Sequence, residues 1–345
     1  MDVKKRNVTQ NDVAREAGVT RSMVSYVISG NTDRSVAPET KQHILDAIEK
    51  LGYRPNKAAQ ALQQGDVAFA AKNIGVVICN EEVFRRPFYS EILAGIHSGA
   101  HEAHYHVRFI RFFDELRNPV LFNNLIHQEE IGGIILVSTD QSIKSKDDFA
   151  VIERIKERIP LIVCVEWQCE GLSSVLFDRQ NTAKKATEYL FRCGYTDIAY
   201  VGENDERVEG VEQVLQLHGL KSNPKEFYKA QTFNMEGGYE AMKSIYENKD
   251  IAVPRSIICG SDEVAIGLLH YLNEKNIAVP QEIAVISIDN IEMSAYTNPP
   301  LTTMNVQKTA MGKRAVEMIV NKTAGKDDDA VSISLPASII QRKSC

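Results

Sequence analysis

The stretch VTQNDVAREAGVTRSMVSYVISG, residues 8–30, has the pattern of two short helices joined by a tight turn. Thr9 is suited to cap the first helix, and Asp12 brings a negative charge to that helix's positive end. Gly18 stands where helices commonly end in a left-handed residue, and Thr20 can cap the second helix. The stretch therefore predicts a helix–turn–helix.

The second helix of this stretch has two distinct faces. Its apolar stripe is Val24, Val27 and Ile28, whereas its outward polar residues are Arg21, Ser22, Ser25 and Tyr26. A helix that enters the DNA major groove needs this arrangement. A third helix is predicted over residues 38–51, with an inward stripe of Ile44, Leu45, Ile48 and Leu51. A three-helix bundle with no DNA role would show the same pattern.

Charge separates this head from the rest of the chain. Residues 1–64 carry ten Lys and Arg against seven Asp and Glu, which gives +3, and the remaining residues give −9, for a total of −6. A basic head on an acidic body suits a nucleic-acid-binding head, because phosphate attracts only one of the two parts. Uneven composition in a short segment is the alternative explanation.

Composition bounds the class of protein. The 345 residues are 43% hydrophobic and 25% charged, which is typical of a globular protein with two or three domains. No apolar run approaches the length of a membrane span, and the first ten residues lack the apolar region of a secretory signal. The six cysteines are scattered, so we expect reduced thiols, no metal site and a cytoplasmic location.

The string DVAREAGVTRSMVSYVISG, continued by SVAPETKQHILDAIEKLGYRPNKAAQAL, resembles the DNA-binding head of the lactose/galactose-repressor (LacI/GalR) family. The resemblance implies a head over residues 1–53 and a hinge over residues 54–71 that becomes helical when two chains meet on DNA. It also implies that Leu62 wedges into the minor groove, where it unstacks a base step and bends the duplex.

Several head and hinge residues match DNA-contacting positions of that family. They are Thr9, Thr20, Arg21, Ser22, Met23, Ser25, Tyr26, Asn31, Tyr53, Asn56, Ala59 and Leu62. Arg21 can hold guanine through two hydrogen bonds. Met23 and Tyr26 depart from the usual Thr and Arg of the family, so the operator sequence cannot be copied from relatives.

From residue 72 onward, apolar runs alternate with amphipathic segments, which predicts parallel sheets with helices between the strands. Ten strands are expected, at residues 74–79, 107–112, 133–137, 161–165, 174–177, 198–201, 256–259, 284–288, 302–306 and 331–335. That number exceeds one comfortable doubly wound sheet. We therefore expect two subdomains with a ligand at the carboxyl ends of the strands.

This body resembles the family's effector-binding core, which has the fold of periplasmic sugar-binding proteins. The strings SDEVAIG, IAVPQEIAVISIDN and NPPLTT carry the resemblance. It implies an all-α head followed by an α/β core, residues 72–345, of two doubly wound parallel-sheet subdomains. One would comprise about 72–172 and 304–332, and the other about 173–303 and 333–345.

Nine core residues match ligand positions of the family. They are Phe88, Tyr89, Asp140, Trp167, Arg207, Phe233, Ser261, Asp262 and Asp289. Aromatic faces suit a sugar ring or a planar base equally well, while Arg and Asp hold hydroxyls, carboxylates or ring N–H groups. Ser261, Arg179 and Gln307 depart from the usual family residues, which leaves the effector's identity open.

Two further groups have structural interpretations. Glu166 is expected to form a salt bridge or to take part in subunit signalling rather than to contact the ligand. The histidines of HEAHYH, at positions 101, 104 and 106, are expected on the surface rather than in a zinc site.

The sequence favours a homodimeric repressor of carbohydrate-utilisation genes that binds palindromic operator DNA and responds allosterically to a sugar or sugar derivative. The chain ends at QRKSC without a heptad tail, which favours a dimer over a tetramer. A sugar receptor without a DNA role would need a signal and no basic head. A sugar-active enzyme with Asp262 and Asp289 as its acid and base lacks supporting motifs, and no cofactor is indicated.

Overall fold

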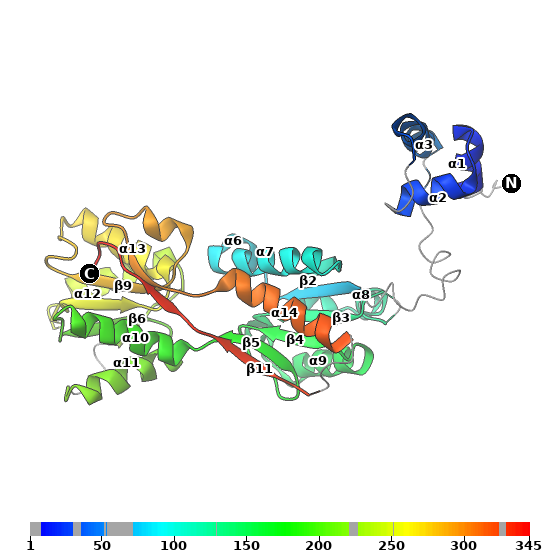
Figure 1. Ribbon diagram of the computed structural model, residues 1–345. Helices are drawn as coiled ribbons and strands as arrows, with labels where there is room; N and C mark the ends of the chain where they lie inside the picture. The colour runs from blue at the N-terminus through cyan, green and yellow to red at the C-terminus, as the bar shows by residue number, and fades with distance from the viewer. Residues whose placement is uncertain are drawn as a thin grey trace. The chain divides into compact units, whose positions relative to one another are not determined.

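The computed structural model describes residues 8–29, 36–51, 53, 72–128, 130–220, 227–250, 252–323 and 329–345. The chain forms two compact units, residues 1–69 and residues 70–345, called here the head and the core. Figure 1 shows helices in the head, and strands covered by helices in the core.

The head contains α1 (Gln10–Ala17), α2 (Arg21–Ser29) and α3 (Pro38–Leu51). The predicted caps are confirmed. Thr9 and Asp12 form a reciprocal capping box, in which the Thr9 amide donates to Asp12 Oδ2 at 2.9 Å. Gly18 ends α1 with φ of 67°, and the Met23 amide donates to Thr20 Oγ1 at 3.4 Å.

Buried side chains of α1, α2 and α3, together with Tyr53 after α3, form the hydrophobic cluster of the head: Val13, Ala14, Val24, Ile44, Ala47 and Tyr53. The expected inward stripe of α3 was wrong at Leu45, whose exposed fraction is 42%. Ile44 and Ala47 lie three positions apart on the inner face, whereas Leu45 is turned about 100° away from Ile44 by the helical period. Ile48 and Leu51 pack against the hydrophobic cluster of the head, as expected.

The described residues of the core form two six-stranded sheets. The first has the order β11-β5-β4-β3-β1-β2, with β1 (Asn73–Ile78), β2 (His106–Phe112), β3 (Gly133–Val137), β4 (Ile162–Val165), β5 (Ser173–Phe177) and β11 (Ser332–Leu335). The second has the order β12-β10-β9-β8-β6-β7, with β6 (Ile198–Gly202), β7 (Phe227–Lys229), β8 (Ser256–Cys259), β9 (Ala284–Asp289), β10 (Thr302–Asn305) and β12 (Ser338–Ile340).

The pairings in both sheets are parallel except for β10 with β12, which is antiparallel. All ten expected strands are present within two residues of their expected ends. The three-residue strands β7 and β12 were missed, because such short edge strands carry no periodic pattern.

Helices cover both sheets (Figure 1). The first half of the core contains α6 (Glu82–Arg85), α7 (Pro87–Glu102), η1 (Phe113–Arg117), α8 (Pro119–Leu125), η2 (Thr139–Ser142), α9 (Lys146–Arg158) and α14 (Lys308–Thr323). The second half contains α10 (Arg179–Arg192), α11 (Glu206–Leu217), α12 (Met235–Glu247), α13 (Asp262–Glu274) and η4 (Glu292–Ala295). α14 packs beside α7, and α12 packs beside α13.

The chain passes between the halves after β5, between β10 and α14, and between β11 and β12. We expected the boundaries between the two subdomains at residues 172/173 and 332/333. These positions differ from the places where the chain leaves the first sheet. Residues 173–177 pair with β4, and residues 332–335 pair with β5, so both strands belong to the first half. The chain therefore crosses to the second half only after β5 and after β11, because backbone pairing holds both strands in the first sheet.

All six cysteines are free thiols, and Cys79, Cys164 and Cys259 are buried. The three histidines of HEAHYH are exposed, as expected. Within the described ranges, no helix has both the length and the apolar character that crossing a bilayer would require.

Candidate functional site

A cavity of about 330 Å³ lies between the halves of the core, at the carboxyl ends of strands from both sheets. Its lining combines aromatic, carboxyl and guanidinium side chains. These residues are Arg86, Phe88, Tyr89, Ser138, Asp140, Gln141, Glu166, Arg179, Glu203, Asp205, Glu206, Arg207, Phe233 and Asp289. We call this cavity the cleft.

Left-handed backbone marks three strand ends in the cleft. Ser138 follows β3 with φ of 48°, Glu166 follows β4 with φ of 71°, and Asp289 ends β9 with φ of 127°. Such conformations are unfavourable for residues other than glycine, and they concentrate at ligand-binding positions. They turn three polar side chains toward the same cavity.

Lys308 supports the strained end of β9. Its buried ammonium donates to the carbonyl oxygens of Asp289 and Asn290, at 2.5 and 3.1 Å. The same group lies 3.4 Å from the Glu91 carboxylate on α7. Lys308 therefore joins the strand end that carries Asp289 to a helix of the first half.

Arg207 is the most enclosed cation of the cleft, with 6% of its side chain exposed. Its Nη1 donates to Asp205 Oδ2 at 2.6 Å, and its guanidinium lies 5.3 Å from the centre of the Phe233 ring. Burial alone would lower the pKa of Arg207, but Tyr200, Asp205 and Asp289 raise it. The group stays positively charged.

Glu166 is the corresponding enclosed carboxyl. It accepts a hydrogen bond from Arg179 Nη2 at 2.9 Å, so the expected salt bridge is confirmed. Burial raises the pKa of Glu166, while Arg179 and Arg207 act in the opposite direction. Among the described residues, neither Glu166 Oε1 nor Arg207 Nε has a hydrogen-bond partner. A buried acceptor and a buried donor in one cavity are thus available to a ligand.

Two ion pairs connect the halves across the cleft. Arg86, at the start of α7, donates from Nε to Glu263 Oε2 at 2.8 Å, and Glu263 lies on α13. Arg179, at the start of α10, meets Glu166 at the end of β4. The Arg86 guanidinium also lies 5.5 Å from the centre of the Phe233 ring. Both pairs favour an approach of the two halves.

Aromatic rings supply the apolar part of the lining. The rings of Phe88 and Tyr89 meet edge to face with centres 5.2 Å apart, and both are buried. Tyr89 OH accepts a hydrogen bond from Gln141 Nε2 at 3.0 Å. Phe233 faces them from the second half. Rings on two sides suit a ligand with a flat apolar face.

Burial also affects the other cleft carboxyls. It raises the pKa of Asp140, and it raises that of Asp289 well above the ordinary value, with repulsion from Asp262 as the second cause. Keeping these groups charged is unfavourable without a partner. A ligand that donates hydrogen bonds to them would relieve that penalty.

Six of the nine sequence-predicted effector residues line the cleft: Phe88, Tyr89, Asp140, Arg207, Phe233 and Asp289. The other three lie elsewhere. The Ser261 hydroxyl caps α13 by accepting from the Val264 amide at 3.2 Å. Trp167 donates from Nε1 to the Leu136 carbonyl at 3.3 Å and lines a different cavity.

Asp262 has a structural position rather than a cleft position. Its carboxylate accepts hydrogen bonds from Ser287 Oγ, Thr303 Oγ1 and the Ile291 amide, at 2.5, 2.6 and 2.8 Å. It is fully buried, and burial raises its pKa to about 6. These three donors hold β9, β10 and the loop after β9 together.

Sequence reasoning missed Arg86, Gln141 and Arg179 as cleft residues, together with the acidic run at 203–206. Arg86 finds its partner 177 positions away, so no local pattern marks it. Arg179 had one usable signal, namely its departure from the usual family residue.

In the head, the predicted DNA-contacting residues of α2 lie together. Arg21, Ser22 and Met23 are exposed, and Ser25 and Tyr26 are partly buried. Tyr53 packs into the core of the head with 9% exposure, so its ring does not lie on this face. Asn31, Asn56, Ala59 and Leu62 lie outside the described residues.

The pattern that defines the family "Bacterial regulatory proteins, lacI family" matches residues 9–56, and that of the periplasmic binding protein-like domain matches residues 187–345. The chain therefore contains a DNA-binding domain of the lacI family and a periplasmic binding protein-like domain. It is 28% identical to the HTH-type transcriptional repressor PurR of Pasteurella multocida, over 97% of this chain and 98% of that protein. The PurR repressor of Haemophilus influenzae strain PittEE is 27% identical with the same coverage.

Solved structures of lacI-type regulators have the same fold. A Lac repressor dimer bound to operator and the anti-inducer ONPF is 22% identical with a TM-score of 0.75, and the match covers 98% of this chain and 99% of that one. The complex of the regulator CelR with cellobiose is 23% identical with a TM-score of 0.68, covering 98% and 100%. This chain is therefore a DNA-binding transcriptional repressor with a ligand-binding domain, not an enzyme.

Proposed function

We propose that two copies of this repressor bind a palindromic operator, and that a small polar effector in the cleft controls the operator affinity. The observation that carries the proposal is the unpartnered pair of Glu166 Oε1 and Arg207 Nε in a cavity between two halves. A ligand that satisfies both atoms contacts both halves at once. Its binding energy then depends on how closely the halves approach.

The chemistry of the cleft favours an uncharged effector with several hydroxyl groups. Six carboxyl side chains and three guanidinium groups line the cavity, so an anion such as a sugar phosphate meets an excess of negative charge. Carboxylates accept hydrogen bonds from hydroxyls, and the rings of Phe88, Tyr89 and Phe233 suit the apolar face of a sugar. We therefore propose a neutral sugar or sugar derivative.

A planar nitrogenous base is the second candidate. A free acceptor and a free donor, as at Glu166 and Arg207, also match the N–H and C=O groups of a heterocyclic amide edge. The aromatic rings of the cleft would stack on such a base. One solved structure of this fold is a regulator in complex with cellobiose, whereas the similar repressors are named PurR, so these relatives do not decide between a sugar and a base.

A thermal-shift screen separates these classes. Neutral sugars, sugar phosphates and nucleobases are added to the full chain, and a ligand of the native state raises its melting temperature. We expect a rise with a neutral sugar. Asp289→Ala should remove that rise, whereas Glu240→Ala, at an exposed carboxylate on α12, should keep it. A rise confined to sugar phosphates would contradict the proposal, and a rise confined to nucleobases would replace the sugar with the second candidate.

The DNA contact is tested with an operator selected from random duplexes. Arg21→Ala should weaken binding at least tenfold and relax base preference at one position, because a bidentate contact to guanine is worth about 1–3 kcal/mol. Arg15→Ala removes the same charge from an exposed site on α1, so any loss there should be equal for all sequences. Equal base preference in both variants would exclude Arg21 as a base contact.

Leu62 tests the hinge that the family resemblance implies. Leu62→Ala should weaken operator binding and leave the effector-induced rise in melting temperature unchanged, because the proposed wedge touches only DNA. Operator and effector should also oppose each other by the same factor. Unchanged operator affinity in this variant would exclude the wedge.

A further inference from the structure

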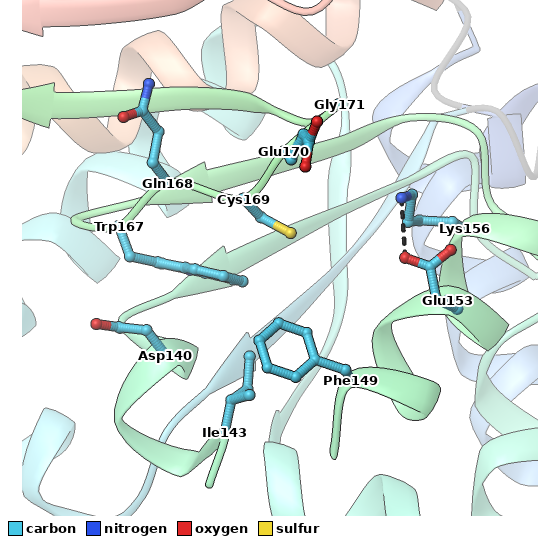
Figure 2. A pocket seen from close by; sticks show the side chains of 10 residues that line it. All are labelled: Asp140, Ile143, Phe149, Glu153, Lys156, Trp167, Gln168, Cys169, Glu170 and Gly171. Atoms are coloured by element: carbon cyan, nitrogen blue, oxygen red, sulfur yellow. Dashed lines mark hydrogen bonds and ion pairs between the residues drawn. The ribbon is translucent and has the colours of Figure 1, made fainter. Parts of the chain in front are cut away.

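The first half of the core contains a second cavity, of about 730 Å³, that is separate from the cleft. It lies between η2, α9 and the loop that follows β4 (Figure 2). Asp140 lines both cavities. Of the nine predicted effector residues, only Asp140 and Trp167 line this cavity, and none of the proposed operator contacts does.

Three apolar side chains form its walls. Trp167 is 7% exposed, and its indole N–H already donates to Leu136, so the ring offers only carbon surface. Figure 2 shows Ile143 and the Phe149 ring on one side of the indole. Phe149 is 54% exposed although it faces this cavity. A ligand ring placed against Trp167 and Phe149 would remove that apolar surface from water.

The charged groups of the cavity favour a cation. Three carboxyl side chains, Asp140, Glu153 and Glu170, stand against the single ammonium of Lys156. Lys156 already pairs with Glu153 at 2.9 Å (Figure 2). An additional positive charge would therefore be attracted, and it would also interact with the indole face.

We propose that this cavity binds a small aromatic cation, with its ring against Trp167 and Phe149 and its positive charge near Asp140 and Glu170. A neutral sugar lacks both features, so this site is distinct from the cleft in ligand class. An aromatic anion of the same size would be repelled.

The two cavities are connected through adjacent residues. Glu166 and Trp167 are consecutive at the end of β4, and Glu166 lines the cleft whereas Trp167 lines the second cavity. A ligand that shifts the indole moves the backbone that holds Glu166 in its left-handed conformation. Occupancy of the second cavity then changes effector affinity, and the effector changes the cation's affinity by the same factor.

Trp167 is the only tryptophan of the sequence, so tryptophan fluorescence reports on this cavity directly. The full chain is titrated with phenethylammonium and, in parallel, with phenylpropionate as an anion of similar shape. We expect a saturable fluorescence change with the ammonium compound alone. No saturable change with phenethylammonium, or equal affinity for both compounds, would overturn the proposal.

Variants locate the bound probe. Phe149→Ala should weaken phenethylammonium binding about tenfold, and Phe149→Tyr, which keeps a ring, should retain it. Phe84→Ala is the matched control, because Phe84 is a 51% exposed ring of the same half that lines neither cavity. A titration that Asp289→Ala abolishes and Phe149→Ala leaves intact would place the probe in the cleft and overturn the assignment. These outcomes do not depend on the identity of the effector.

Discussion

The two halves of the core share one topology but are closed in different ways. Each has six strands in the part of the chain that the structure describes, and in each the first two of these strands lie at one edge of the sheet. In the second half, α12 and α13 are near neighbours along the chain. In the first half, α7 packs against α14, which the chain reaches only after the second sheet's first five strands.

Both helix pairs use a glycine to approach closely. A Cβ at Gly267 on α13 would overlap the Met235 carbonyl of α12, and a Cβ at Gly312 on α14 would overlap the Ile92 carbonyl of α7. The two close contacts are equivalent. However, only the contact at Gly312 joins helices that are separated along the chain by the second half of the core. The first half therefore depends on α14, a helix that the chain forms only after it has passed through the second half. We therefore expect the halves to unfold together.

The largest expected effect comes from these glycines. Gly267→Ala and Gly312→Ala should each lower the free energy of unfolding by about 3 kcal/mol, because backbone must move to admit the methyl group. Denaturant unfolding is followed by Trp167 fluorescence, which reports on the first half, and by circular dichroism. Both signals should shift together in both variants. A fluorescence transition unaffected by Gly267→Ala would show that the halves unfold independently.

Gly99→Ala is the milder control for this pair of variants. A Cβ at Gly99 on α7 would lie 3.1 Å from Lys313 Cα, a tight contact that a small adjustment can relieve. Its loss of stability should therefore be smaller than that of Gly312→Ala. An equal loss would mean that the close approach at Gly312 is not the cause.

The next effect concerns the buried carboxyls of the second half. Burial raises the pKa of Asp262 from 3.8 to about 6, so the folded protein holds a proton that the unfolded chain releases. Its contribution to stability is then lost as the pH rises from about 4 to about 6. We expect a fall of about 2 kcal/mol in the free energy of unfolding over this window.

Asp262→Asn should flatten that pH profile, because the amide does not ionise and the hydroxyls of Ser287 and Thr303 can turn to accept from it. Asp250→Asn, at an exposed position, should leave the profile unchanged. A wild-type profile that rises with pH over the same window, in melting experiments, would contradict the assignment.

The smallest effect is expected at the ion pairs that join the halves. A double-mutant cycle for Arg86 and Glu263 should give a coupling free energy of about 1 kcal/mol, since one partner keeps some exposure. The Arg179 and Glu166 cycle should give a similar value. A zero coupling at both pairs, measured by denaturation, would mean that the halves are joined by the crossovers alone.

Sequence reasoning located most of the strands but fewer of the site's contacts. Buried strands such as β3 and β9 are continuous apolar runs, so their positions could be read directly from the sequence. The crossover after β5 could not be read from the sequence, because the sheet to which a strand belongs depends on the strand with which it pairs. Leu45 shows the same limit in a helix, where an apolar residue lies beside the inward stripe without joining it.

At the site, strand ends could be identified but not the direction of their side chains. Glu166 and Trp167 are adjacent, yet Glu166 lines the cleft and Trp167 lines the second cavity, so motif position alone did not indicate which side chain faces the cleft. Asp262 was also predicted to contact the effector. Its carboxylate instead accepts hydrogen bonds from residues on neighbouring strands, such as Thr303 on β10. Arg86 required the fold, since its partner is remote in sequence.

The late return of α14 and β11 to the first half has a consequence during translation. Residues 73–177 emerge from the ribosome well before residues 308–335, so the nascent first sheet lacks an edge strand and the helix that carries Met311, Val316 and Ile319. Until that helix is made, the surface that it covers stays open to water and to other chains. A chaperone would therefore encounter this repressor first at the face beneath α14.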